Sequence, residues 1–249
     1  HLSQLPEPQP MGRFHNPTSF ADFIGEIGDS LARHNISVGE SEIVTTNENK
    51  NGEGQRMFGA MRIFGVGENA KEFSVVLAFR GSYDQSIKRG LAIGTSVMCC
   101  SNLCFSGDLG TWHTKQTTNV NQRIPQLIDA AILKLPDAGA REVVRIEKYK
   151  SVEILPRTGD TALVHLYKNK ALSASQLGTA INEWHKPSHE EHKLNGFSIF
   201  RLLNACTESI KPNGTTSNPF TIEAKTRAQT AFLDQVVDKG FSTAITTIH

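Results

Sequence analysis

RMFGAMRIFGV (residues 56–66) and FSVVLAFR (residues 73–80) are two runs of apolar and small side chains separated by a short segment that contains Gly and Asn. A third β-prone run, residues 36–46, precedes them across the polar turn NENKNGEG (residues 47–54). Turns rich in Asn and Gly between short apolar runs are typical of β-hairpins. The three runs therefore predict an antiparallel β-meander.

A helix is predicted immediately before the meander. Asn16 and Pro17 suit the N-cap and the first helical position, and His34-Asn35 marks the end. Apolar residues between them follow helical spacing and form one face: Phe20, Phe23, Ile24, Ile27 and Leu31. We expect this face to pack on the sheet, and residues 1–15 to form a Pro-rich N-terminal arm.

The segment after the meander, residues 81–114, is rich in Gly, Ser and Cys. We expect a short helix over residues 84–92 and a buried strand over residues 96–100. We also expect Gly107 and Gly110 to interrupt regular structure.

The rest of the chain has helical periodicity. The predicted helices cover residues 123–135, 141–155, 160–172, 173–184, 197–210 and 222–239, with a loop over residues 211–218. Ser173 and Gln176 have the spacing of a capping box. The predicted fold class is α+β, with an antiparallel β-meander and its packed helix in the first half and a helix-rich second half. We expect a single α+β domain over residues 16–249, with a β-rich subregion at 16–114 and a helical one at 115–249.

Charge and hydropathy narrow the class of protein. The chain has 26 Lys and Arg against 25 Asp and Glu, a formal net charge of +1. This balance argues against a dedicated polyanion binder but leaves room for a local basic face. No apolar run approaches the ~20 residues that cross a bilayer, and the start has no secretory signal. These features predict a soluble cytoplasmic protein that does not contact a membrane.

A cysteine cluster is the first group of residues that bears on cofactors. Cys99, Cys100 and Cys104 lie close together in an apolar stretch. A zinc site here would take its further ligands from His113 and Cys206. Structural zinc sites use two closely spaced Cys pairs, of which only one loose half is present. Buried reduced thiols are the alternative that we favour.

A histidine-rich turn is the second such group. It contains His185, His189, His192, Glu190 and Glu191. Such a run either holds a divalent ion or forms a solvated loop. We favour the loop, and we predict no metal and no cofactor.

Two segments carry motifs that packing alone does not require. Residues 77–108, LAFRGSYDQSIKRGLAIGTSVMCCSNLCFSGD, are followed by His113-Thr114, and residues 184–211 contain NACTESIK. Through these motifs and the opening PMGRFHNP, the chain resembles a phage- and plasmid-related family catalogued as a domain of unknown function, number nine hundred and thirty-two. The chain departs from the family pattern at Tyr83, where His is expected, and at Ser101. The resemblance implies a mobile-element product in a bacterial cytoplasm and supplies no reaction.

The run from Arg80 to Ser86 places a cation, hydroxyls and a carboxylate at a predicted strand-to-helix junction. Backbone N–H groups at such a junction suit an anion or a phosphate. The alternative is a helix cap by Ser82 or Asp84, with Arg80 paired to Asp84 or Asp108. The candidate nucleic-acid or ligand-binding residues are Arg80, Ser82, Asp84, Asn102, Asp108, His113, Lys115 and Arg123. No catalytic residue is assigned.

The middle of the chain has a modest excess of cations interleaved with acids. The cations are Lys115, Arg123, Lys134, Arg141, Arg145, Lys148, Lys150, Arg157, Lys168 and Lys170. This pattern is typical of a charged helix surface, or of a groove that follows a phosphate backbone. In the second case Trp112 or Tyr149 would stack on bases.

These observations leave three hypotheses of function. The first is an accessory protein of a mobile element that binds nucleic acid without cleaving it, with single-stranded DNA as the favoured partner and strand annealing by a homo-oligomer as a concrete form. The second is a small-ligand or nucleotide-binding enzyme with a site around Arg80–Asp84, Asn102 and His113. The third is a protein that binds and inhibits a host defence factor. We place nucleic-acid binding first.

Overall fold

The computed structural model of the chain describes residues 18–48, 54–66, 73–83, 88–97, 102–112, 123–193, 196–210 and 219–246. Only the backbone is described for residues 46–48, 54–55, 73, 95–97, 102–112, 191, 219–221, 223 and 246. The chain divides into two compact units. The sheet unit comprises His1–Asn69, Ser74–Gly94 and Gly107–Ala140, and the helical unit comprises Ala70–Phe73, Thr95–Ser106 and Arg141–His249. The predicted single domain stays a prediction, and the predicted arm lies outside the described residues.

Five strands form one sheet in the order β1-β2-β3-β4-β5, so each strand lies beside its neighbour in the chain. The strands are β1 (Ser37–Glu48), β2 (Gly54–Phe64), β3 (Phe73–Ser82), β4 (Arg89–Val97) and β5 (Asn102–Trp112). The pairs β1–β2 and β2–β3 are antiparallel. The predicted meander is confirmed, and two further strands extend it.

Two predictions for the segment after the meander are wrong. Residues 89–92 lie in β4 rather than in a helix, because Leu91 and Ile93 alternate with small residues and both are buried in the core. The strand β5 runs through Gly107 and Gly110 without interruption, since glycine weakens a strand without ending it. Of the predicted strand over 96–100, the last two residues of β4 are described and residues 98–100 lie outside the described part of the chain.

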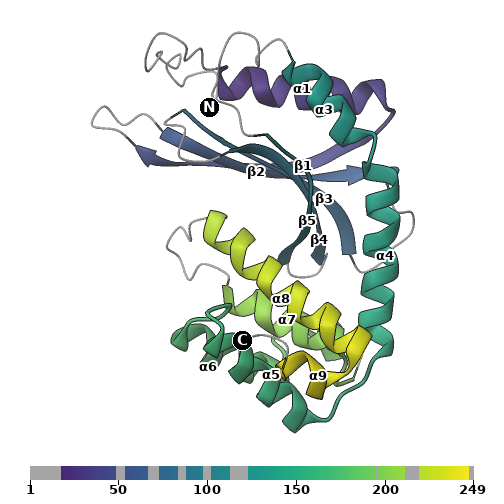
Figure 1. The fold of residues 1–249 in the computed structure, drawn as a ribbon, viewed down its shortest axis with the longest axis vertical. Coiled ribbons are helices and arrows are strands. Elements are labelled where there is room, and N and C mark those ends of the chain that lie inside the picture. Colours follow the sequence, from purple (N-terminus) through teal and green to yellow (C-terminus); the bar gives the residue numbers. More distant parts are fainter. Residues whose placement is uncertain are drawn as a thin grey trace. The chain divides into compact units, whose positions relative to one another are not determined.

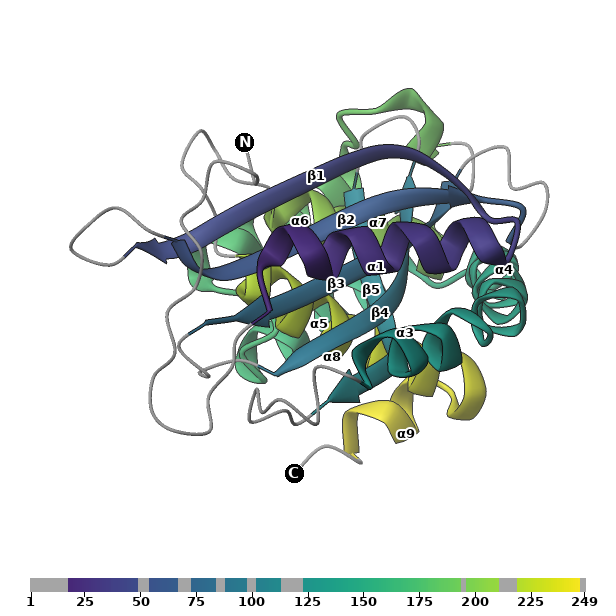
Figure 2. The ribbon, with the colours of Figure 1, turned by 90° about the horizontal axis from the view of Figure 1, so that it is seen from above.

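Helix α1 (Phe20–Arg33) covers one face of the sheet together with α3 (Ile124–Ile132), as Figures 1 and 2 show. The N-cap of α1 is Ser19, whose hydroxyl accepts a hydrogen bond from the Asp22 N–H at 2.9 Å. This observation corrects the predicted N-cap, Asn16. The helix ends at its predicted place, with His34 as C-cap.

The core of the sheet unit lies between these two helices and alternate residues of the strands. The register pairs Leu77 with Met61 and Phe79 with Gly59. A Cβ atom at Gly59 would lie 2.2 Å from the Phe79 ring, so the ring fills the space that a side chain at Gly59 would need. Burying each large apolar side chain contributes about 1.5–3 kcal/mol to stability, and this alternation explains why the meander is recognisable in the sequence.

The helical unit confirms the helix-rich second half. Its elements are α4 (Leu135–Ser151), α5 (Pro156–Lys168), α6 (Ala174–His185), the 3₁₀ helix η2 (Glu190–Lys193), α7 (Ile199–Ile210), α8 (Pro219–Lys239) and α9 (Phe241–Thr246). The first six residues of α4 belong to the sheet unit. Helix α5 begins at Pro156, earlier than predicted, because proline suits the first helical position. No helix in the described part of the chain has the length and apolar character needed to span a membrane.

Trp184 lies at the centre of the core of the helical unit. Its ring is fully buried and its indole N–H donates to the Pro156 carbonyl at 3.0 Å. Arg201 of α7 donates from Nε to the Trp184 carbonyl at 2.9 Å and from Nη2 to the His185 carbonyl at 3.2 Å. The guanidinium of Arg201 thus satisfies the carbonyls at the end of α6 and joins α6 to α7.

Candidate nucleic-acid interface

A pocket of about 460 Å³ opens on the helical unit where α5, α6 and α8 meet. Its lining residues are Tyr167, Lys168, Lys170, Leu172, Ser173 and Lys225. Three lysines and two hydroxyl groups line it, and none of the six residues is acidic. We call this feature the lysine pocket.

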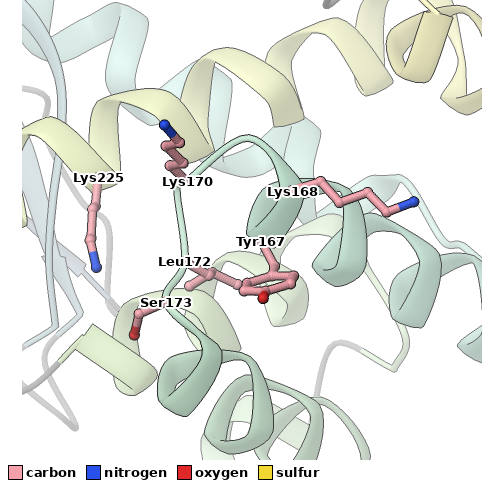
Figure 3. Close-up of a pocket in the computed structure, with 6 residues that line it drawn as sticks. All are labelled: Tyr167, Lys168, Lys170, Leu172, Ser173 and Lys225. Carbon is pink, nitrogen blue, oxygen red and sulfur yellow. The ribbon is translucent and has the colours of Figure 1, made fainter.

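The turn between α5 and α6 forms one wall of the lysine pocket. Asn169 is the C-cap of α5, and Lys170 follows in the left-handed region with φ 62°. The Ala171 N–H then donates to the Leu166 carbonyl at 2.9 Å, which closes the end of the helix. Because of this turn, the side chains of Lys168 and Lys170 leave the chain in different directions (Figure 3).

The first turn of α6 and one residue of α8 form the other wall. Ser173 and Gln176 make the predicted capping box: the Ser173 N–H donates to Gln176 Oε1 at 2.9 Å, and the Gln176 N–H donates to Ser173 Oγ at 3.3 Å. The Lys225 ammonium donates to the same Gln176 Oε1 at 2.5 Å. The start of α6 therefore fixes a cation that belongs to α8.

The electrostatics of the pocket favour an anion. Burial lowers the pKa of Lys225, because desolvation disfavours its charged form and Gln176 is a neutral partner. The exposed Lys168 and Lys170 form no ion pair within the described part of the chain. The N-terminus of α6 adds a partial positive charge. A bound phosphate would relieve the excess positive charge.

The cations of α4 are arranged differently. Arg145 pairs with Glu142, Lys148 with Asp238 and Lys150 with Glu147, at N–O distances of 2.5, 2.6 and 2.9 Å. Most of their charge is therefore balanced locally. Of the predicted central cations, Lys168 and Lys170 are the two that line the pocket.

The predicted site residues are only partly brought together. Arg80 and Ser82 lie on one face of β3, two residues apart, where Arg80 is half-buried and Ser82 is 0% exposed. Arg123 is exposed at the start of α3. The backbone of Asn102 and Asp108 lies in β5. Asp84, His113 and Lys115 lie outside the described residues.

One of the two predicted stacking aromatics is unsuitable. Tyr149 is 1% exposed, and its hydroxyl donates to Asp234 Oδ1 at 2.5 Å, so its ring belongs to the core. The other, Trp112, has only its backbone described. An aromatic that does reach solvent in the helical unit is Tyr167, which is 41% exposed and lines the lysine pocket.

The proposed metal-ligating clusters are also partly described. Cys206 is a buried thiol in α7 that forms no disulfide. The backbone of Cys104 lies in β5, whereas Cys99, Cys100 and His113 lie outside the described residues. Within the described ranges, no three His, Cys, Asp or Glu residues are grouped to hold a metal ion. His185 instead approaches Asp160 at 2.8 Å, His192 is buried, and Glu190–Lys193 form η2. The predicted solvated loop is therefore wrong for this part of the turn.

Sequence reasoning missed Tyr167 and Lys225 as members of the pocket. Lys225 lies far from the α5–α6 turn in the chain, and nothing in its local pattern separates it from the other surface cations. A usable signal was the Ser173–Gln176 capping box, because it places a helix N-terminus directly after Lys168 and Lys170.

Comparisons of the chain with protein-family models, with curated proteins and with solved structures give no match. The resemblance to the phage- and plasmid-related family therefore stays a prediction.

Proposed function

We propose that the chain is a mobile-element accessory protein that binds nucleic acid, with single-stranded DNA favoured, and that does not cleave it. The observation that carries this proposal is the lysine pocket, in which three lysines and an exposed tyrosine share one lining without an acidic residue. Lysines supply phosphate contacts, and an exposed aromatic ring supplies a surface for a base. The family resemblance adds the mobile-element context and the bacterial cytoplasm as parts of the same proposal.

The directions of the lysine side chains favour a strand over a single phosphate. In Figure 3 the ammonium groups of Lys168, Lys170 and Lys225 point away from one another rather than toward a common centre. A lone phosphate would be served best by converging donors. Diverging cations suit successive phosphates along one backbone.

The position of Tyr167 favours a single strand over a duplex. A base can stack on a side chain only when its face is free, which holds in single strands and not inside a paired duplex. Tyr167 and Leu172 both line the pocket (Figure 3), and the exposed ring of Tyr167 offers a face on which an unpaired base can stack.

The residues of the pocket favour binding over bond cleavage. Cleavage by a side-chain nucleophile needs a hydroxyl or thiol next to a general base. The six lining residues include no histidine and no carboxylate, and the Ser173 hydroxyl accepts the Gln176 N–H within the capping box. The pocket thus offers cations, hydroxyls and a ring, which are the components of a binding site.

A fluorescence-anisotropy titration with labelled oligothymidylate tests the proposal. We expect tight binding at low salt and a linear fall of log K with log salt concentration. Single strands contribute a slope of about −0.7 for each neutralised phosphate. The double variant Lys168→Ala/Lys170→Ala should weaken binding and reduce the slope by about 1.4, that is, by two such contacts.

Lys148→Ala is the matched control. It removes one positive charge from the same unit, but from a lysine that already pairs with Asp238, so its salt slope should stay at the wild-type value. Tyr167→Ala should weaken binding to the single strand by about 1–3 kcal/mol, the usual contribution of one stacked base. Binding that is absent at low salt, or that falls equally in Lys148→Ala and in the double variant, contradicts the proposal.

A further inference from the structure

Arg89 is a buried cation at the edge of the sheet-unit core. It is the first residue of β4 and is 2% exposed. Its Nη2 donates to the Thr18 carbonyl at 2.7 Å, directly before the N-cap of α1. The guanidinium lies over the Phe23 ring at 5.3 Å from its centroid. The stem of Arg89 passes so close to Gly81 that a Cβ atom there would lie 3.2 Å from Arg89 Cγ.

The charge of Arg89 is not compensated within the described part of the chain. Its Nε and Nη1 are buried and have no acceptor, and no carboxylate of the described residues forms an ion pair with it. A buried charge without a charged partner is costly. Burial lowers the pKa of Arg89 to about 10, although the nearby Tyr83 and Asp22 act in the opposite direction. An anionic partner would remove this cost.

The first turn of α1 lies next to Arg89 and Tyr83. The Phe20 N–H donates to the Tyr83 hydroxyl at 2.7 Å, and the rings of Phe20 and Tyr83 stack at 3.8 Å. This pairing holds Tyr83 at the first turn of α1, where the partial positive end of the helix lies. Asp22 is the one acidic residue in that first turn, and its charge acts on Arg89 although no ion pair between the two residues forms. Helix N-termini are frequent sites for phosphate groups.

We propose that Arg89 and the N-terminus of α1 form a binding site for a phosphate group. Nη2 uses one of its two N–H groups for the Thr18 carbonyl. One edge of the guanidinium can therefore offer an oxyanion two donors, and the remaining unpartnered nitrogen offers one. The ligand is a phosphate group, because its oxygens match the planar fork of the guanidinium. This group is either free inorganic phosphate or the terminal phosphate of a strand, and it is bound independently of the lysine pocket.

Thermal unfolding of the full chain in inorganic phosphate tests the proposal, with chloride at the same pH and ionic strength as the reference. We expect a saturable rise of Tm in phosphate, because a ligand that binds only the folded state stabilises it. Arg89→Met should abolish the rise. In chloride, Arg89→Met should unfold at the wild-type Tm or above it, because replacing a buried unpaired charge by an apolar side chain removes a desolvation cost.

The triple variant Lys168→Ala/Lys170→Ala/Lys225→Ala separates this site from the proposed function. It should keep the phosphate-dependent rise, whereas Arg89→Met should keep the salt-dependent binding of oligothymidylate. A tighter binding of 5′-phosphorylated than of 5′-hydroxyl oligothymidylate that Arg89→Met abolishes would assign the group to a strand end. Equal binding of the two oligonucleotides together with the rise in Tm would assign it to free phosphate.

Three results would overturn the proposal: no phosphate-dependent rise in the wild type, a rise that survives in Arg89→Met, or a rise that the triple lysine variant abolishes. If Arg89→Met does not fold, Arg89→Lys decides. Lysine keeps the charge but lacks the planar fork, so the Kd for phosphate should be at least tenfold weaker, and an unchanged Kd contradicts the site.

Discussion

Gly159 and Trp184 are in such close contact that the structure leaves no room for a methyl group between them. A Cβ atom at Gly159 would lie 2.3 Å from Trp184 Cε2, and the indole is held in place by its hydrogen bond to Pro156. Neither partner can move without disturbing the start of α5. The glycine is therefore explained by the neighbouring ring rather than by its own backbone conformation.

We expect Gly159→Ala to destabilise the protein by about 1–3 kcal/mol, the usual cost of overfilling a packed core. Gly178→Ala in α6 is the matched control, because nothing lies within 4 Å of the added methyl group. That variant should stabilise the protein by about 0.5–1 kcal/mol, since alanine loses less backbone freedom in a helix. Urea unfolding measures both. Effects of the same sign would contradict the account of Gly159.

Asp129 joins two elements of the sheet unit, α1 and α3. Its carboxylate accepts hydrogen bonds from the Ser30 hydroxyl and from Arg33 Nη2, the latter at 2.9 Å. These bonds lower the pKa of Asp129, in the order Ser30 and then Arg33, against a smaller effect of burial. The pair of helices that covers the sheet is thus held in part by an ionised carboxylate.

The hydrogen bonds of the Asp129 carboxylate make the stability of the protein depend on pH. Because the folded-state pKa of Asp129 lies below its unfolded-state value of about 3.9, its contribution is complete above that pH. It is lost as the pH falls through the lower folded-state pKa. We expect the free energy of unfolding of the wild type to exceed that of Asp129→Asn at neutral pH, and the gap to narrow below about pH 4. Urea unfolding at several pH values measures the gap, and a gap independent of pH would contradict this assignment.

Elements with a clear period are predictable from the sequence, and the others are not. The strands over residues 56–66 and 73–80 are recognisable because their apolar residues pack against α1. The start of α6 is recognisable from the capping box of Ser173 and Gln176. The first part of β4 is missed because Leu91 and Ile93 alternate with Gly90, Ala92 and Gly94, and glycine and alanine have no preference for strands.

The candidate site is less predictable than the fold for a physical reason. Lys168 and Lys170 are recognisable as cations in the sequence. Whether a lysine is ion-paired, as Lys148 is with Asp238, depends on which carboxylates lie near it in the folded protein. The contribution of Lys225 depends on the packing of α8 beside α6. The burial of Arg89 could not be predicted either, because nothing in the sequence around it distinguishes it from a surface cation.

At the scale of the whole molecule, the described residues form two hydrophobic clusters that share no residue. Ile27 belongs to the cluster of the sheet unit and Ile199 to that of the helical unit, and both are fully buried. We expect Ile27→Val and Ile199→Val each to cost about 0.5–1.5 kcal/mol. Their double variant should equal the sum within about 0.5 kcal/mol, because independent sites are additive. Urea unfolding of the four proteins measures the coupling, and a larger departure from additivity would show that the two cores respond as one.

The chain contains two tryptophans, Trp112 and Trp184, and they fall in different units. In Trp112→Phe the remaining fluorescence comes from Trp184, which is buried in the core of the helical unit. Its emission maximum and its quenching therefore report on that unit alone. In Trp184→Phe the emission reports on the sheet unit. The two single-tryptophan variants would therefore allow the unfolding of each unit to be followed separately by fluorescence. The binding of a DNA strand or of phosphate to each unit could be followed in the same way.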